Sequence, residues 1–110
     1  MEKLSLDAQV RELLKLAAAS STGRSAHTVY GGHEHTLRQT LIVLTAGTVL
    51  AEHENPGEAT LMVLRGRVVL IGDDASWEGR SGDFLVAPKT RHSLEALEDS
   101  AVLLTVAKRG

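Results

Sequence analysis

The chain of 110 residues contains no cysteine, no long apolar run and no large excess of charge. The absence of cysteine excludes disulfide bonds, iron–sulfur clusters and thiolate zinc sites, and it fits a cytoplasmic location. No apolar stretch approaches the roughly 20 residues that span a bilayer, and Glu2 and Asp7 are unlike the start of a signal peptide. With a formal net charge of −2, we expect neither nucleic acid nor an acidic membrane as partner.

A helical period is strong only near the N-terminus. The apolar positions Leu6, Val10, Leu13, Leu14 and Ala17 follow the spacing of one helix face. Ser5 is a suitable N-cap, and residues 20–23 (Ser-Ser-Thr-Gly) end the pattern. Such a face usually packs against the protein's own core, and the alternatives are a cover over a barrel mouth or a dimer interface.

Short β-rich runs separated by turn residues fill the rest of the chain. The predicted strands cover residues 37–44, 48–54, 59–64, 67–71, 76–78, 84–87, 92–97 and 101–107, whereas residues 24–30 give no clear pattern. No second helix is predicted after residue 23, which excludes parallel β–α–β crossovers. The regular spacing of the strands predicts a jelly roll or a small barrel.

Residues 47–66 resemble the first motif of the cupin family. That motif reads Gly, five residues, His-x-His, three or four residues, Glu, six residues and Gly. Gly47, His53 and Gly66 match it with the spacing intact. Asn55 stands where the second His belongs, and Ala59 stands where the Glu belongs.

Residues 82–92 resemble the second cupin motif, which reads Gly, five residues, Pro-x-Gly, two residues and His. Gly82 and Pro88 match, Thr90 replaces the second Gly, and His92 comes one residue early. The short segment between the two motifs is typical of the smallest bacterial members. Two motifs in the right order, on a compatible strand pattern, make the resemblance moderately specific.

The resemblance implies an all-β cupin double-stranded β-helix, or jelly-roll barrel, with one N-terminal α-helix. We expect one domain over residues 1–110, in which residues 1–23 form the helix and linker and residues 37–107 form the barrel. Family members of this size also imply a homodimer.

The resemblance also implies a metal site, because cupins hold a divalent metal with two His and a Glu of the first motif and one His of the second. His53 and His92 are the ligand positions that remain. The implied cofactor is one divalent transition metal (iron, manganese, nickel, copper or zinc), which imidazole and carboxylate ligands suit. Two ligands are fewer than the three of a typical catalytic zinc. A barrel that holds a small molecule without metal, or a purely structural histidine pair, is therefore the alternative.

Three more residues are candidate ligand contacts. Asn55 lies two residues after His53, and residues two apart on a strand face the same way. His33 and His35 form a second pair of this kind if their segment is extended, and otherwise they lie in a polar loop. His27 has no motif around it and is expected on the surface.

Two further positions depend on which face of a strand they occupy. Either Arg38 or Gln39 can point into the barrel, and we take Gln39 as the candidate ligand contact. Glu58 replaces the missing carboxylate only if a bulge follows residues 56–57, because a one-residue shift reverses the face of a side chain.

Three functions remain open. The first is a small cupin that binds a small molecule, with or without a divalent metal, inside the barrel. The second is a metal-dependent enzyme of the oxygenase or isomerase type. The third is a non-catalytic protein that senses a metabolite or pH through its histidines. No catalytic residue is identified.

Overall fold

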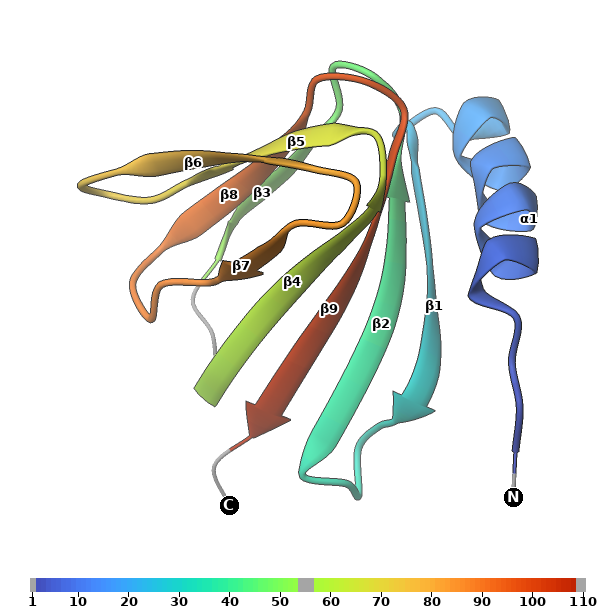
Figure 1. The fold of residues 1–110 in the computed structure, drawn as a ribbon, viewed down its shortest axis with the longest axis horizontal. Helices are drawn as coiled ribbons and strands as arrows, with labels where there is room; N and C mark the ends of the chain where they lie inside the picture. Colours follow the sequence, from blue (N-terminus) through green and yellow to red (C-terminus); the bar gives the residue numbers. More distant parts are fainter. Residues whose placement is uncertain (1, 54–56, 109–110) are drawn as a thin grey trace.

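One helix and nine strands make up the described parts of the chain (Figure 1). The structure is a computed structural model that describes residues 2–53 and 57–108, with the backbone alone at residues 52 and 53. The elements are α1 (Leu6–Ala19), β1 (Arg24–Gly31), β2 (Leu37–Leu44), β3 (Val49–His53), β4 (Gly57–Arg65), β5 (Arg67–Ile71), β6 (Ser76–Arg80), β7 (Phe84–Val86), β8 (His92–Ala96) and β9 (Ser100–Lys108).

Helix α1 forms where the apolar spacing predicts it. The side chain of Ser5 accepts a hydrogen bond from the backbone N–H of Ala8 at 3.2 Å, which confirms it as the N-cap. Val10, Leu13 and Ala17 are buried, so the helix covers the protein's own core. The hydroxyl of Ser25 in β1 donates to the carbonyl of Leu13 at 2.6 Å and ties the helix to the sheet beneath it.

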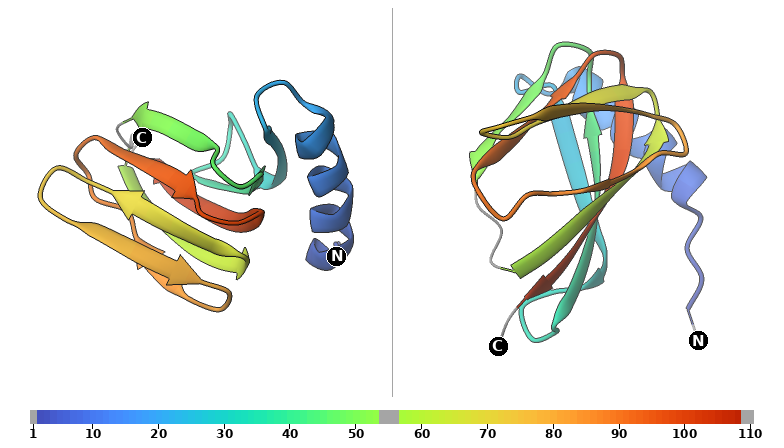
Figure 2. Two further views of the ribbon diagram at one scale, coloured as in Figure 1. Left: turned by 90° about the horizontal axis from the view of Figure 1, so that it is seen from above. Right: turned by 60° about the vertical axis from the view of Figure 1, so that its left-hand side comes forward.

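The strands form two antiparallel sheets that face each other (Figure 2). The five-stranded sheet has the order β1-β2-β9-β4-β7, and the four-stranded sheet has the order β3-β8-β5-β6. Helix α1 lies outside the sandwich beside β1 and β2 (Figures 1 and 2). The motif glycines Gly47, Gly66 and Gly82 all have positive φ, between 85° and 93°, as the turns between strands require.

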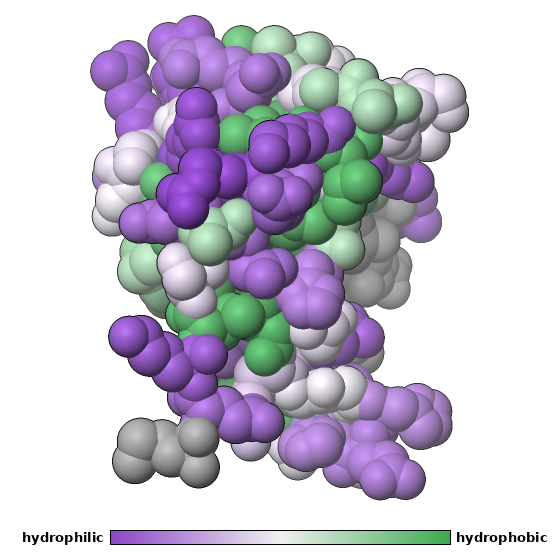
Figure 3. All heavy atoms as spheres, turned by 90° about the vertical axis from the view of Figure 1, so that its right-hand side faces the viewer, coloured by the Kyte–Doolittle hydropathy of each residue, from purple (hydrophilic) through white to green (hydrophobic). Residues whose placement is uncertain are grey.

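Two apolar clusters result from this arrangement. The barrel core lies between the sheets and includes Ile42, Leu61 and Leu94, whereas the helix core lies between α1 and the outer face of the sheet and includes Leu41 and Val43. Seen from the helix side, apolar patches show between many polar side chains (Figure 3). No helix within the described ranges is long and apolar enough to cross a membrane.

Strand β1 is the element that the sequence pattern does not predict. It pairs with β2 from Arg24 opposite Leu44 to Gly31 opposite Arg38, with an irregularity between Thr28 and Tyr30. Most of its residues are exposed because it is an edge strand. An edge strand with little buried surface has no regular apolar alternation, and this is why residues 24–30 give no clear signal.

Candidate functional site

The two motif histidines lie opposite each other where β3 and β8 pair. His53 is the register partner of His92, and Leu50 is the partner of Leu94. Strand β3 therefore uses three residues where β8 uses two, which is a β-bulge. In a regular ladder Glu52 would oppose His92, so the bulge determines which residue comes into register at this position.

His92 is buried at the start of β8. The residue is 4% exposed, and it shares a strand face with Leu94 and Ala96 of the barrel core. The Nδ1 atom lies 2.9 Å from the carbonyl oxygen of Thr90. A carbonyl oxygen only accepts hydrogen bonds, so Nδ1 is the donor, and in the neutral ring the lone pair is on Nε2.

The position of the missing carboxylate is filled by a buried methyl group. Ala59 is 4% exposed and belongs to the barrel core. Glu58 is exposed and lies on the opposite face of β4. Its pairing with Ala107 continues the regular ladder, and the irregularity in β4 comes later, between Val63 and Arg65. The hypothesis that a bulge turns Glu58 inward is therefore wrong.

The described side chains at this position do not make up a three-ligand metal centre. Among the side chains that the structure describes, in residues 2–51 and 57–108, no three His, Asp or Glu groups gather closely enough to hold a metal ion. His92 supplies one inward imidazole, and Asn55 lies outside the described residues. If a metal binds here, the described side chains supply only some of its ligands.

Comparison with known proteins places this arrangement in a family. The model of the family described as "Cupin domain" matches residues 40–107. The chain belongs to the cupin family. A solved RmlC-like cupin from Desulfovibrio desulfuricans is 31% identical, with a TM-score of 0.67 over 76% of this chain and 81% of that one. The two sheets, the motif glycines and the single helix are thus those of a jelly-roll cupin, as predicted.

Two other solved structures show how widely this cupin fold is shared. A conserved protein of unknown function from Streptococcus pyogenes is 25% identical, with a TM-score of 0.74 over 83% of this chain and 79% of that one. Salicylate 1,2-dioxygenase from Pseudaminobacter salicylatoxidans is 22% identical, with a TM-score of 0.75 over 92% of this chain but 32% of its own. No curated protein matches the sequence.

The other histidines of this cupin lie in exposed segments. Residues 33 and 34 form a turn between β1 and β2, where His33 and His35 are exposed. The segment is therefore a polar loop and not an extended strand that carries both side chains on one face. The ring of His35 packs edge-on against Tyr30, with 5.8 Å between ring centroids. His27 is exposed on β1, as expected of a surface residue.

Gln39 faces away from the barrel. It shares a strand face with Leu41 and Val43, which pack in the helix core, and its amide donates to the hydroxyl of Thr105 at 3.3 Å. The prediction that Gln39 contacts a ligand in the barrel is therefore wrong. The inward position belongs to Arg38, which shares a face with Ile42 of the barrel core.

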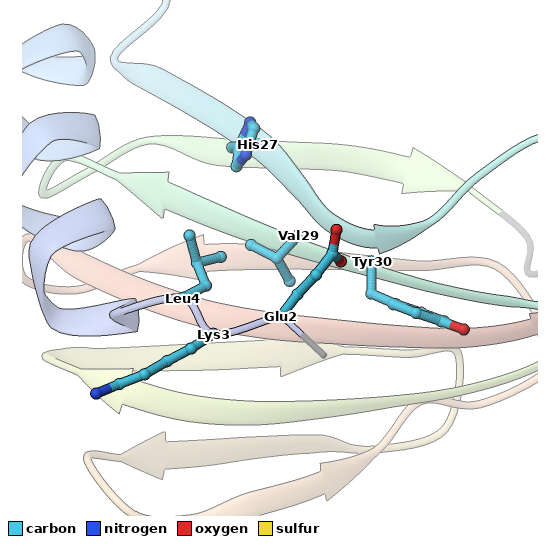
Figure 4. Close-up of a pocket in the computed structure, with 6 residues that line it drawn as sticks. All are labelled: Glu2, Lys3, Leu4, His27, Val29 and Tyr30. Atoms are coloured by element: carbon cyan, nitrogen blue, oxygen red, sulfur yellow. The ribbon is translucent and has the colours of Figure 1, made fainter.

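Other hollows lie on the outside of the cupin. One of about 500 Å³ lies between the N-terminal arm, with Glu2, Lys3 and Leu4, and strand β1 (Figure 4). A second, of about 470 Å³, is lined by apolar side chains of β7 and by Trp77 of β6. A third opens between β1 and β3 and includes Arg24, which the sequence analysis missed because its strand gave no pattern.

Proposed function

We propose that this cupin binds a small molecule inside its barrel, at the end where β3 and β8 pair, and that His53 and His92 contact the molecule. The observation that carries the proposal is the buried imidazole of His92, whose Nδ1–H is held by the Thr90 carbonyl. This bond fixes the orientation of the ring. A polar ring held in one orientation beside an apolar interior is the kind of group that orients a ligand.

The register of the two strands supports a role for His53. Directly opposite residues in an antiparallel pair share a face of the sheet, and His53 opposes His92. We propose that the second imidazole also reaches the ligand, so that the molecule would present a hydrogen-bond donor to one ring and a second polar group to the other.

A divalent metal is not required by this proposal. Two imidazoles leave a transition metal short of the three protein ligands usual in a catalytic centre, and the first-motif carboxylate is replaced by Ala59. A metal held by His53 and His92 would need further ligands from the bound molecule or from residues outside the described ranges. We therefore propose a binding protein in place of an enzyme.

The first test is the metal content and thermal stability of protein purified without a nickel column or chelator. We expect less than stoichiometric metal by elemental analysis. We also expect small polar metabolites to raise the Tm of metal-free protein in a screen. A ligand at ten times its Kd adds about 1.4 kcal/mol to the free energy of unfolding, which shifts the Tm by several degrees in a domain of this size.

Variants show whether a stabilising molecule acts at the proposed site. His92→Gln should abolish the Tm shift, whereas the matched control His35→Gln, in the exposed loop, should keep it. A shift that survives in His92→Gln would place the ligand elsewhere. One metal per chain in purified protein, lost in both His53→Ala and His92→Ala, would contradict the metal-independent proposal and favour the metal-dependent enzyme.

We also propose that the cupin is a homodimer built through the outer face of the five-stranded sheet. Phe84, Met62 and Leu103 are register partners in a row across β7, β4 and β9, and Phe84 and Met62 are 59% and 42% exposed. The next row, Val86, Thr60 and Thr105, is also uncharged. Uncharged, largely apolar surface favours association, and a face without charge does not repel its own copy across a two-fold axis.

The dimer is tested by measuring the mass in solution by light scattering. Met62→Glu, which places two like charges near the axis, should shift a dimer to monomer. Glu12→Gln on the exposed side of α1 is the control and should leave the mass unchanged. A wild-type monomer at high protein concentration, or a Met62→Glu dimer, would contradict this interface.

A further inference from the structure

The two sheets leave an open seam between β1 and β3, because each is the end strand of its sheet. At one end the seam is closed by hydrogen bonds to the backbone carbonyl of Gly23. This carbonyl accepts the backbone N–H of Thr45 at 2.8 Å and the hydroxyls of Thr45 and Thr48 at 3.1 and 3.4 Å. A groove of about 330 Å³ lies next to these bonds and is lined by residues of β1, β2 and β3.

The groove, which we call the seam groove, has an apolar floor. Ile42 and Leu50 line it from β2 and β3, and Ala26 lines it from β1. Ala26 and Ile42 are register partners, and Ile42 belongs to the barrel core. Because cross-strand partners share a face, Ala26 extends the interior apolar surface out to the protein's edge. The volume is at the lower end of the range for small-molecule sites, roughly 300 Å³ and above.

One charged residue lines the seam groove, and it is a cation. Arg24 is the register partner of Leu44, and its guanidinium makes no ion pair with any residue in the described ranges. Thr22 and Thr40 add hydroxyl groups. A guanidinium binds a carboxylate through two parallel hydrogen bonds. A single cation beside an apolar floor therefore suits one carboxylate on a compact apolar body.

We propose that the seam groove is a binding site for a small apolar carboxylate, such as an aromatic or short branched acid. Arg24 binds the carboxylate, and Ala26, Ile42 and Leu50 bind the apolar part. This site is separate from the histidines at the β3–β8 end, so it holds or fails independently of the function proposed for them.

The test is an NMR titration of the metal-free protein with benzoate, its neutral analogue benzamide and the cation benzylammonium. Benzoate should give saturable shifts of the backbone amides of Ala26, Ile42 and Leu50. Benzamide should bind about five- to tenfold more weakly, and benzylammonium weaker still, because each loses the ion pair with an exposed arginine. Without saturable benzoate shifts up to about 10 mM, ten times a millimolar Kd, the proposal is overturned.

Variants assign the interaction to the seam groove. Arg24→Gln should weaken benzoate binding to the level of benzamide, whereas Arg11→Gln, which removes the same charge from exposed α1, should not. Ala26→Phe, on an exposed edge strand, should fill the groove and remove binding while the spectrum stays dispersed. Equal benzoate affinity in Arg24→Gln and wild type would overturn the assignment of the carboxylate.

A final variant separates the two proposals. In His92→Ala the shifts at Ala26 and Leu50 should persist. Suppose instead that His92→Ala loses the benzoate shifts and that the wild-type shifts centre on the amides of Ser93 and Leu94. Benzoate would then bind at the β3–β8 end of the barrel, which overturns the seam site and supports the barrel site.

Discussion

The sandwich is closed along one pair of sheet edges and open along the other. On the closed side, edge strand β6 leads directly into edge strand β7 through residues 81–83. There Val63 donates to the carbonyl of Asp83 at 2.9 Å, and Gly82 donates to the carbonyl of Val63 at 2.7 Å. On the open side, the crossing from sheet to sheet starts at β2, and β1 lies beyond it at the edge.

The difference shows what closes a sandwich of this kind. A short connection between two edge strands draws the edges together, whereas a connection that leaves from an inner strand leaves its outer neighbour without a partner. Strand β1 is that neighbour, and the Gly23 carbonyl with Thr45 and Thr48 holds one end of it. The same topology that closes the barrel core on one side therefore creates the seam groove on the other.

The largest expected loss of stability comes from shortening a leucine, and it should differ between the closed and the open edge. Leu61, buried in the barrel core, has Leu85 of the closed edge as its register partner, whereas Leu50 is half-buried at the seam. Leu61→Ala should lower the free energy of unfolding by about 2–5 kcal/mol, and Leu50→Ala by about 1–2 kcal/mol, because less apolar surface is lost. Urea denaturation measures both. Equal losses would mean that the open edge is packed as tightly as the closed one.

A smaller loss of stability is expected when the hydroxyl hydrogen bonds to the Gly23 carbonyl at the open edge are removed. The double change Thr45→Val and Thr48→Val removes two hydroxyl donors from the Gly23 carbonyl but keeps the backbone N–H donor. We expect a loss of about 1–2 kcal/mol. Amide hydrogen exchange should accelerate in β1 first, since the edge strand opens locally. The control is Thr36→Val in the exposed loop before β2. Uniform acceleration of exchange in both sheets would contradict a specific effect of the two hydroxyls on β1.

The smallest effect is expected at the turn of the closed edge. Asp83 accepts a hydrogen bond from the backbone N–H of Arg80 at 2.8 Å through an exposed carboxylate. Asp83→Ala should cost about 0.5–1.5 kcal/mol, and Asp83→Asn, which keeps an acceptor, should cost less. Exchange in β1 should not change in either variant. Faster exchange in β1 would show that the two edges are coupled and do not open independently.

The sequence predicts the fold better than it predicts which face of each strand points into the barrel. The run Leu41–Leu44 is buried throughout, with alternate residues in the helix core and the barrel core. A strand covered on both sides reads as a continuous apolar run, so its alternation cannot say which side faces the barrel. The apolar run therefore does not distinguish Gln39 from Arg38 as the residue that faces the barrel.

The sequence predicts the two histidines of the site but not the backbone geometry that pairs them. The motifs identify His53 and His92, and a bulge in β3 brings these two residues into register. No feature of the sequence between Leu50 and His53 predicts that bulge. The seam groove was missed because it depends on β1, which has too little buried surface to show a pattern.

The bulge in β3 also makes one residue of the site removable without any change of side chain. Deleting Ala51 would leave a regular ladder, with Leu50 opposite Leu94, Glu52 opposite Ser93 and His53 still opposite His92. The two histidines would remain register partners, and the irregular backbone between them would be gone. A Tm screen of that deletion variant, beside the parent chain, would show whether ligand binding needs the bulged backbone or only the pairing of the two histidines.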